Sequence, residues 1–179
     1  MDSINKNQSE ENHENLTNRD ATKKIQELIK EVSTCFFCTH ASGSDTGGVR
    51  PMSVQKVDDD GDIWFLSAKD SHKNKEISID PGVKLYFIGS AQSDFMQLDG
   101  QATINDDKAK IKELWQPILK TWFTDGVDDS RISVIKVTPS TGYYWDTRHG
   151  KAIAGVKILI GAITGKTFDD SIEGKLKLS

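Results

Sequence analysis

The sequence predicts an α+β fold, in which an antiparallel barrel or sheet carries helices at its edges. The chain of 179 residues is long enough for one domain with a buried core. Its predicted elements follow the order helix, three strands, helix, two strands, helices and two strands. This order differs from the alternating strand–helix series of a parallel sheet, and it therefore favours the antiparallel arrangement.

Helical periodicity occurs in three parts of the chain. Residues 21–32 place apolar side chains on one face and lysines and glutamates on the other. Residues 69–79 fit a second helix, which begins after a strand. Residues 106–115 fit a third helix, and residues 117–123 fit a further helical turn that begins with a proline.

Seven segments either alternate between apolar and polar residues or are rich in branched and aromatic ones, as strands are. They are residues 33–40, 49–57, 63–67, 83–89, 95–104, 131–138 and 142–145. The loop 41–48 is dense in turn formers and predicts a hairpin. Pro51 cannot donate to a ladder, so its strand is expected at an edge or a barrel opening. Gly100 predicts a bulge or a close backbone approach.

The two ends of the chain are expected to differ from its centre. Among the first 20 residues, Ile4 and Leu16 are the only large apolar side chains, too few to offset the entropy of ordering. We therefore expect a disordered arm over residues 1–18 and one domain over residues 19–146. Residues 147–179 are expected to form a helix, around residues 152–163, and a polar tail packed on that domain.

Composition excludes several classes of function. The net charge of −4 argues against nucleic-acid binding. The sequence has no apolar run long enough for a membrane span and no secretion signal, so a cytoplasmic protein is expected. Cys35 and Cys38 have a C-x-x-C spacing, but on a strand their side chains point to opposite faces. They therefore predict two buried, reduced cysteines and no metal site.

Two short segments could bind a phosphate. Arg50 shares a strand face with Met52, so its guanidinium could bind phosphate beside an apolar floor. Ser67, His72 and Lys73 lie where a strand leads into a helix, and the free N–H groups of a helix N-terminus attract anions. The alternatives are a surface arginine in a hairpin and one more solvated lysine.

These segments occur in an order that resembles a known family. The chain is similar to the pyridoxamine 5′-phosphate oxidase-like split barrels, and specifically to the bacterial general stress protein branch that binds FMN. The resemblance runs from about residue 20 to the C-terminus. Its motifs are residues 50–53, residues 61–67 with Ser71 and Lys73, residues 81–83, residues 99–104 with Asp107, residues 114–117, residues 122–123 before Gly126, and residues 144–146.

The resemblance implies a six-stranded antiparallel split β-barrel with peripheral helices. It also implies a homodimer with two FMN sites at its interface. Arg50, Ser67 and Lys73 match positions that hold the phosphate, and the backbone of residues 52–53 and 65–66 matches the part facing the ring. Trp115 and Trp145 are expected to contribute from the partner subunit. The full expected cofactor-binding set is Arg50, Pro51, Met52, Ser53, Phe65, Leu66, Ser67, His72, Lys73, Trp115 and Trp145.

The implied activity is that of a flavin-dependent oxidoreductase with NADH or NADPH as donor. The oxidases proper carry an Arg-Leu-His type motif, whereas this chain has Arg148-His149 with different spacing and no leucine. Pyridoxamine phosphate oxidation is therefore not expected. No residue is predicted to be catalytic, because the chemistry belongs to the flavin. The alternatives are a non-catalytic flavin-binding or flavin-buffering protein, and a barrel that holds haem or a deazaflavin.

Overall fold

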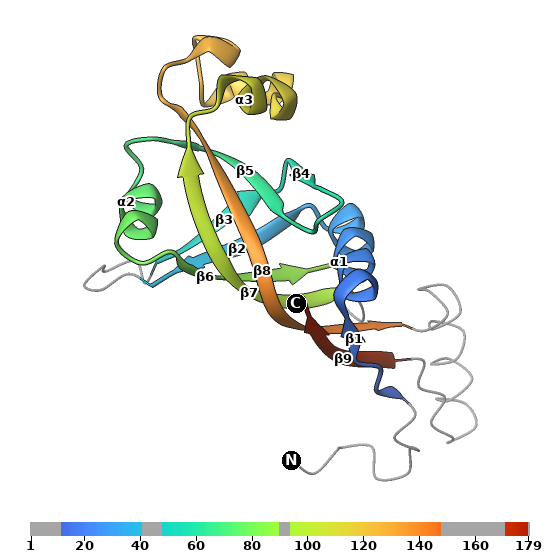
Figure 1. Cartoon of the computed structure of the whole chain (residues 1–179). Helices are drawn as coiled ribbons and strands as arrows, with labels where there is room; N and C mark the ends of the chain where they lie inside the picture. Colours follow the sequence, from blue (N-terminus) through green and yellow to red (C-terminus); the bar gives the residue numbers. More distant parts are fainter. Residues whose placement is uncertain (1–11, 41–47, 90–93, 148–170, 179) are drawn as a thin grey trace, which may run out of the picture.

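The structure is a computed structural model that describes residues 12–40, 48–89, 94–147 and 171–178. It has an α+β fold, built on one mixed sheet of nine strands that curls around a core. In Figure 1, α1 lies at the right of the curled sheet and α2 at its left, and α3 lies beyond the end of β7. This arrangement confirms the predicted fold class and is consistent with a split barrel.

The elements follow one another in the order seen in Figure 1. They are β1 (Leu16–Thr17), α1 (Asn18–Glu31), β2 (Thr34–Thr39), β3 (Val49–Ser53), β4 (Lys56–Val57), β5 (Ile63–Ala68), α2 (His72–Ile79), β6 (Gly82–Ile88), β7 (Phe95–Asn105), α3 (Lys108–Leu114), the 3-10 turns η2 (Pro117–Thr121) and η3 (Gly126–Asp128), β8 (Ile132–Thr147) and β9 (Ser171–Lys177).

The sheet has the order β1-β9-β8-β7-β6-β2-β3, and β5 pairs with both β8 and β4. All pairs are antiparallel except β1 with β9. The ladder does not close, because β3 pairs with β2 whereas β4 pairs with β5. The change of partner occurs at two residues: the Val54 N–H donates to Ser33 O at 2.7 Å, and the Gln55 N–H donates to Trp64 O at 2.8 Å.

The core consists of two clusters. The larger one lies between the inner face of the sheet and α1, which contributes Ala21, Ile25, Leu28 and Ile29. The smaller one lies under α3 and η2, where Ile111 and Leu119 pack against β5 and β8. The periodicity that predicted α1 and α3 therefore reflects the burial of one face of each helix.

The expectation of six strands is wrong, because the sheet has nine, and β1 and β9 are two that no predicted strand covers. Other predicted strands have different bounds from those expected. The predicted strand 49–57 divides into β3 and β4 at the change of partner. The predicted strands 131–138 and 142–145 join into β8. Pro139 is tolerated inside β8 because the neighbouring strand on one side of β8 changes at this position. On that side β8 pairs with β5 as far as Val137 and with β9 from Thr141 onward.

Gly100 lies at a bulge and at a close backbone approach, as its position predicted. The register between β7 and β8 shifts between Asp99 and Gly100. A Cβ atom on Gly100 would come within 2.6 Å of Thr138 O. The edge position predicted from Pro51 is also confirmed, since β3 ends the path of the sheet.

The ends of the described chain form sheet where an arm and a tail were expected. In place of the arm, Leu16 pairs in parallel with Leu176 of β9 and packs against the main core. The Tyr144 hydroxyl donates to Glu14 O at 2.9 Å. In place of the polar tail, β9 pairs with β8 over its whole length. Residues 1–11 and the predicted helix around residues 152–163 lie outside the described residues.

The two cysteines are free and point to opposite faces, as expected from their strand. Cys35 is buried, and this burial raises the pKa of its thiol to about 12. Cys38 is only half-buried, so the expectation that both are buried is wrong for this residue. No group of three metal-ligating side chains occurs among the described residues. Likewise, none of the described helices has the length and apolar character needed to cross a membrane.

We predict that Gly174→Ala destabilises the protein by about 1–3 kcal/mol, the usual cost of forcing a methyl group into a packed site. A Cβ atom at this position would overlap the carbonyl oxygen of Glu14, so the segment before β1 must move away from β9. Urea denaturation measures the loss. Lys175→Ala, at the exposed neighbouring position, is the control. Equal stability of the two variants would contradict the packing of residues 14–17 on β9.

Candidate functional site

A cluster of charged residues forms where the edge strand β3 meets α2. Arg50 of β3 makes a two-pronged ion pair with Glu76 of α2, in which Nη1 lies 2.7 Å from Oε2 and Nη2 lies 2.8 Å from Oε1. Thr39 of β2 supports both partners: its hydroxyl donates to Glu76 Oε2 at 2.6 Å and accepts from Arg50 Nη1 at 3.2 Å. Lys73 lies one helical turn before Glu76, on the same face of α2. We call Thr39, Arg50, Lys73 and Glu76 the Arg50 cluster.

The electrostatics of the Arg50 cluster leave one cation without a close partner. Burial, and then the nearby Arg50 guanidinium, hold the pKa of Lys73 below its usual range, and Glu76 offsets this only in part. The hydrogen bond from Arg50 holds the pKa of Glu76 below its usual range. Within the described part of the chain, the Lys73 ammonium group makes no hydrogen bond or ion pair. A half-buried ammonium group of this kind is stabilised by a bound anion.

A buried polar network fixes the start of α2 and hence the position of Lys73. Ser71 caps the helix by accepting from the Asn74 N–H at 3.3 Å. Asn74 accepts from the Ser67 hydroxyl at 2.9 Å and donates to the Ser133 hydroxyl at 2.8 Å. Ser133 in turn donates to Ser67 O at 3.0 Å, which ties β8 to β5. Ser67 is therefore buried under α2, and its hydroxyl is bonded to Asn74.

The opening of the ladder lies beside this cluster. Within the described residues β3 pairs only with β2, and β5 beyond Trp64 pairs only with β8. The backbone of residues 51–53 and residues 65–67 thus presents an edge that no strand covers. The side chains of Phe65 and Leu66 are buried, one in each core cluster, so only their backbone can face this opening.

The residues of β3 divide between two faces of the sheet. By register, Arg50 and Met52 lie opposite Phe37 and Cys35 on the inner face. Pro51 lies opposite Phe36 on the outer face, and Ser53 follows on the same side. The strand therefore borders both the Arg50 cluster and the outer surface of the sheet. His72, the first residue of α2, is exposed beside Lys73.

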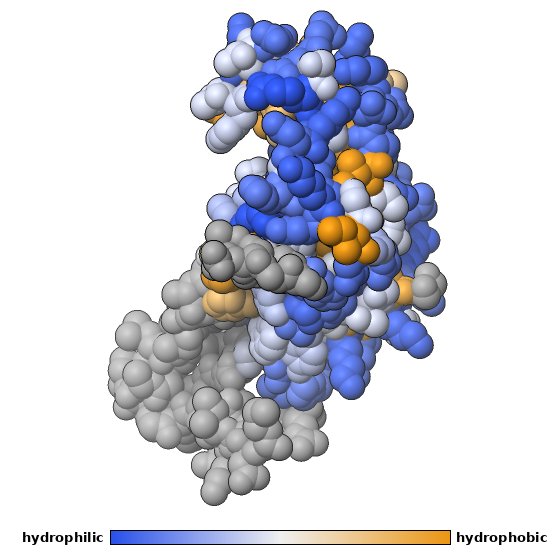
Figure 2. All heavy atoms as spheres, turned by 90° about the vertical axis from the view of Figure 1, so that its left-hand side faces the viewer, coloured by the Kyte–Doolittle hydropathy of each residue, from blue (hydrophilic) through white to orange (hydrophobic). Residues whose placement is uncertain are grey.

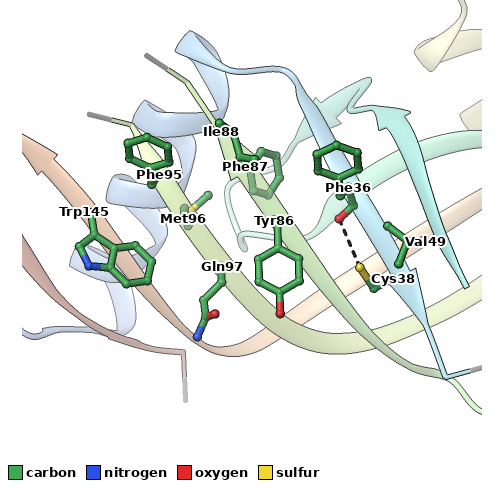
Figure 3. Close-up of a pocket in the computed structure, with 10 residues that line it drawn as sticks. All are labelled: Phe36, Cys38, Val49, Tyr86, Phe87, Ile88, Phe95, Met96, Gln97 and Trp145. Atoms are coloured by element: carbon green, nitrogen blue, oxygen red, sulfur yellow. Dashed lines mark hydrogen bonds between the residues drawn. The ribbon is translucent and has the colours of Figure 1, made fainter. Parts of the chain in front are cut away.

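The outer face carries an apolar groove of about 460 Å³. Its lining residues, drawn as sticks in Figure 3, come from β2, β3, β6, β7 and β8. The lining residues include Phe36, Cys38, Val49, Tyr86, Ile88, Phe95 and Trp145. By contrast, the side of the molecule that bears α2 is mostly hydrophilic, with hydrophobic residues only in small separate patches (Figure 2).

The two tryptophans expected at the flavin lie apart from each other in this chain. Trp145 contacts Tyr143, with 4.7 Å between ring centroids, and lines the groove. Trp115 packs on Phe123 at 6.5 Å, beside the smaller core cluster. Their expected contribution from a partner subunit stays a prediction.

The sequence singled out Arg50 and Lys73 as candidates but not the residues that contact or position them. Glu76 could have been suspected from its place three residues after Lys73 on one helix face. Asn74 could have been suspected as a polar residue inside a helix. Thr39 and Ser133 carry no local signal, because only strand pairing brings them to the site.

The comparisons with known proteins agree with this fold. The family described as pyridoxamine 5′-phosphate oxidase like matches residues 20–169. The chain therefore belongs to this family. The protein bli-3 of Neurospora crassa is 27% identical over 156 residues, which cover 80% of this chain and 75% of the relative. General stress protein 26 of Bacillus subtilis is 28% identical over 80 residues, 43% of this chain and 56% of the relative.

Solved structures show the same fold. A candidate general stress protein 26 from Jannaschia sp. CCS1 has a TM-score of 0.75 and 24% identity, covering 89% of this chain and 99% of that one. The general stress FMN/FAD binding protein from Xanthomonas citri has a TM-score of 0.56 and 23% identity, covering 66% of this chain and 82% of that one.

We predict that Lys73→Met raises the melting temperature of the flavin-free protein by a few degrees at neutral pH, because it removes a poorly solvated charge. A folded-state pKa below the unfolded value means that charged Lys73 destabilises the fold at neutral pH. This penalty fades as the pH rises through the lowered pKa toward the usual lysine range. The difference between variant and parent should therefore shrink with rising pH in thermal scans.

Lys75→Met is the matched control for this prediction, because Lys75 lies on the same helix but is exposed. We expect little change in its melting temperature at any pH. A fall in melting temperature for Lys73→Met would show that its ammonium group is already compensated in the free protein.

Proposed function

We propose that the chain binds FMN, with the phosphate held by Arg50 and Lys73 and the flavin ring at the opening between β3 and β5. The observation that carries the proposal is the half-buried Lys73 ammonium group, which has no ion pair among the described residues and lies beside a second cation. A phosphate dianion would compensate both charges. This donor chemistry fits the phosphate group of FMN.

The uncovered strand edges support the placement of the ring. The pyrimidine edge of a flavin needs backbone or side-chain hydrogen bonds, and the ring faces need apolar cover. The backbone of residues 51–53 and 65–67 could provide the hydrogen bonds. Met52, half-buried on the same strand face as Arg50, could provide part of the cover. The relative from Xanthomonas citri, which is named for FMN/FAD binding, agrees with this class of cofactor.

The arrangement favours a flavin over haem. Of the two histidines in the barrel region, His40 is hydrogen-bonded to Asp80 at 3.0 Å, and His72 is exposed at the start of α2. A bound flavin supplies one-electron and two-electron redox chemistry, while the residues of the chain bind and orient it. We propose an oxidoreductase of this kind, with NADH or NADPH as the electron donor.

We also propose that the apolar groove is covered by a second copy of the chain. Several large apolar side chains on this face are exposed, among them Phe36, Tyr86, Ile88 and Trp145. A contiguous apolar patch of this kind on a soluble chain is typical of an interaction surface. Since β3 borders both this face and the Arg50 cluster, a homodimer formed here would bring partner residues toward the flavin.

The main test compares FMN with riboflavin, which lacks the phosphate. We expect Arg50→Ala to weaken FMN binding by roughly 1–3 kcal/mol, the scale of a charge-assisted contact, and to leave riboflavin binding nearly unchanged. Titration followed by flavin fluorescence gives both affinities. Arg131→Ala, which removes an arginine that is paired with Asp129 and does not belong to the Arg50 cluster, is the control.

The absorption spectrum of the purified protein accompanies this test. Protein that carries no flavin and takes up none would contradict the proposal as a whole. Unchanged FMN affinity in Arg50→Ala would contradict only the phosphate assignment. Anaerobic addition of NADH or NADPH then separates an oxidoreductase, whose flavin is bleached, from a flavin-buffering protein, whose flavin stays oxidised.

For the dimer, we predict that Ile88→Asp raises the dissociation constant by roughly tenfold or more, because a buried unpaired carboxylate is costly. Sedimentation over a range of protein concentrations measures it. Ile79→Asp, at an even more exposed isoleucine of α2 (86% against 54%), is the control. The groove is not the interface if both variants sediment like the parent.

A further inference from the structure

The hydrogen bonds of Arg50 leave one edge of its guanidinium unused. A guanidinium carries five N–H donors: two on Nη1, two on Nη2 and one on Nε. Glu76 accepts one from Nη1 and one from Nη2, and Thr39 accepts the second one from Nη1. The remaining N–H groups, one on Nη2 and one on Nε, have no acceptor among the described residues. They lie on the same edge of the group, where two parallel donors suit a phosphate or carboxylate.

We propose that Glu76 is a positioning residue for the phosphate of FMN: it fixes Arg50 so that the free Nε–Nη2 edge is presented to that phosphate. Glu76 thereby selects a phosphorylated flavin over riboflavin. This inference rests on the proposed function and adds to it a residue that would not itself contact the cofactor.

The rigidity of Glu76 supports a positioning role. Its carboxylate accepts from both Nη atoms of Arg50 and from the Thr39 hydroxyl, and its side chain is only 15% exposed. It extends from α2, whose start is fixed by the network of Ser67, Asn74 and Ser133. A guanidinium held at three points keeps few rotamers, so little conformational entropy is lost when its free edge binds an anion.

Charge provides the second argument. Arg50 and Lys73 repel each other, and burial increases the cost of placing two cations together. A carboxylate on the far edge of the guanidinium reduces this cost and leaves the cluster one net positive charge before any ligand binds. Glu76 occupies the end-on edge of Arg50, so a phosphate on the other edge does not have to displace it.

The opposite role for Glu76 makes the opposite prediction. If the carboxylate competed with the phosphate for Arg50, its removal would strengthen FMN binding. If Glu76 served only the stability of the fold, its removal would weaken the binding of every flavin alike. The three cases differ in the ratio of FMN to riboflavin affinity.

The experiment measures the dissociation constants of FMN and riboflavin for Glu76→Gln by fluorescence titration. We expect FMN to bind roughly tenfold more weakly, on the scale of one charge-assisted contact, and riboflavin to bind as before. Glu113→Gln removes a similarly paired carboxylate, bonded to Lys56 and Lys110, and should change neither constant. Tighter FMN binding, or an equal loss for both flavins, would overturn the proposal.

A double-mutant cycle with Arg50→Ala gives a second, independent readout. Without Arg50 the Glu76 carboxylate faces the phosphate with no guanidinium between them. We therefore expect Glu76→Gln to weaken FMN binding in the parent and to strengthen it in the Arg50→Ala background. The same loss in both backgrounds would show that Glu76 does not act through Arg50. A parent protein that binds neither flavin would instead contradict the proposed function itself.

Discussion

The rest of the molecule depends on the change of hydrogen-bonding partner at Val54 and Gln55. At Val54 the chain still bonds to Ser33, the residue just before β2, and at Gln55 it already bonds to β5. A strand that leaves one neighbour and joins another cannot keep both ladders continuous, so β3 and β5 each retain an uncovered edge. Uncovered edges are a liability in most sheets, because they pair with other chains. Here the edges lie beside a pair of cations, where a bound cofactor could use the free backbone groups.

Helix α2 connects this opening to the charges. Its first turn is held by the side-chain amide of Asn74, which bonds to hydroxyl groups of β5 and β8, and α2 lies on a mostly hydrophilic side of the molecule. The helix brings Lys73 and Glu76 to Arg50, which lies on a different strand, and burial then raises the cost of the charges. Binding sites often contain charged groups that are destabilised by burial and by nearby like charges. A bound ligand of opposite charge offsets the lost stability.

On the outer face of the sheet, unlike the inner face, several large apolar side chains remain exposed. The inner face of β2 is covered by the core, whereas its outer face leaves Phe36 and the half-buried Cys38 at the surface. The same alternation places Tyr86 and Ile88 outside on β6. Strand period therefore gathers apolar side chains on part of the outer face, and an exposed apolar patch of this kind is typical of an interaction surface.

Local patterns were sufficient for much of the fold. Helix α1, strands β2, β5, β6 and β7 and the bulge at Gly100 follow from periodicity, propensity and a single glycine, all of which act within a few residues. The continuity of β8 through Pro139 was not predictable in this way, because it depends on which strands lie on either side. The pairing of β1 with β9 was not predictable from local patterns either. Burial of Leu16 alone does not offset the entropy of ordering the segment around it, but Leu176, far along the chain, lies beside it and increases the buried apolar surface.

The same division applies to the candidate site. By itself the sequence determined that Arg50 lies on an edge strand and that Lys73 lies in the first turn of a helix, because residue type and spacing fix both. It also determined that Cys35 and Cys38 point apart. Only the tertiary structure decided that Glu76 and Thr39 hold Arg50, that Ser67 is turned toward Asn74, and that Trp115 and Trp145 lie apart in one chain. Those contacts join residues from different strands and helices, and no local rule specifies a contact that depends on how the whole sheet curls.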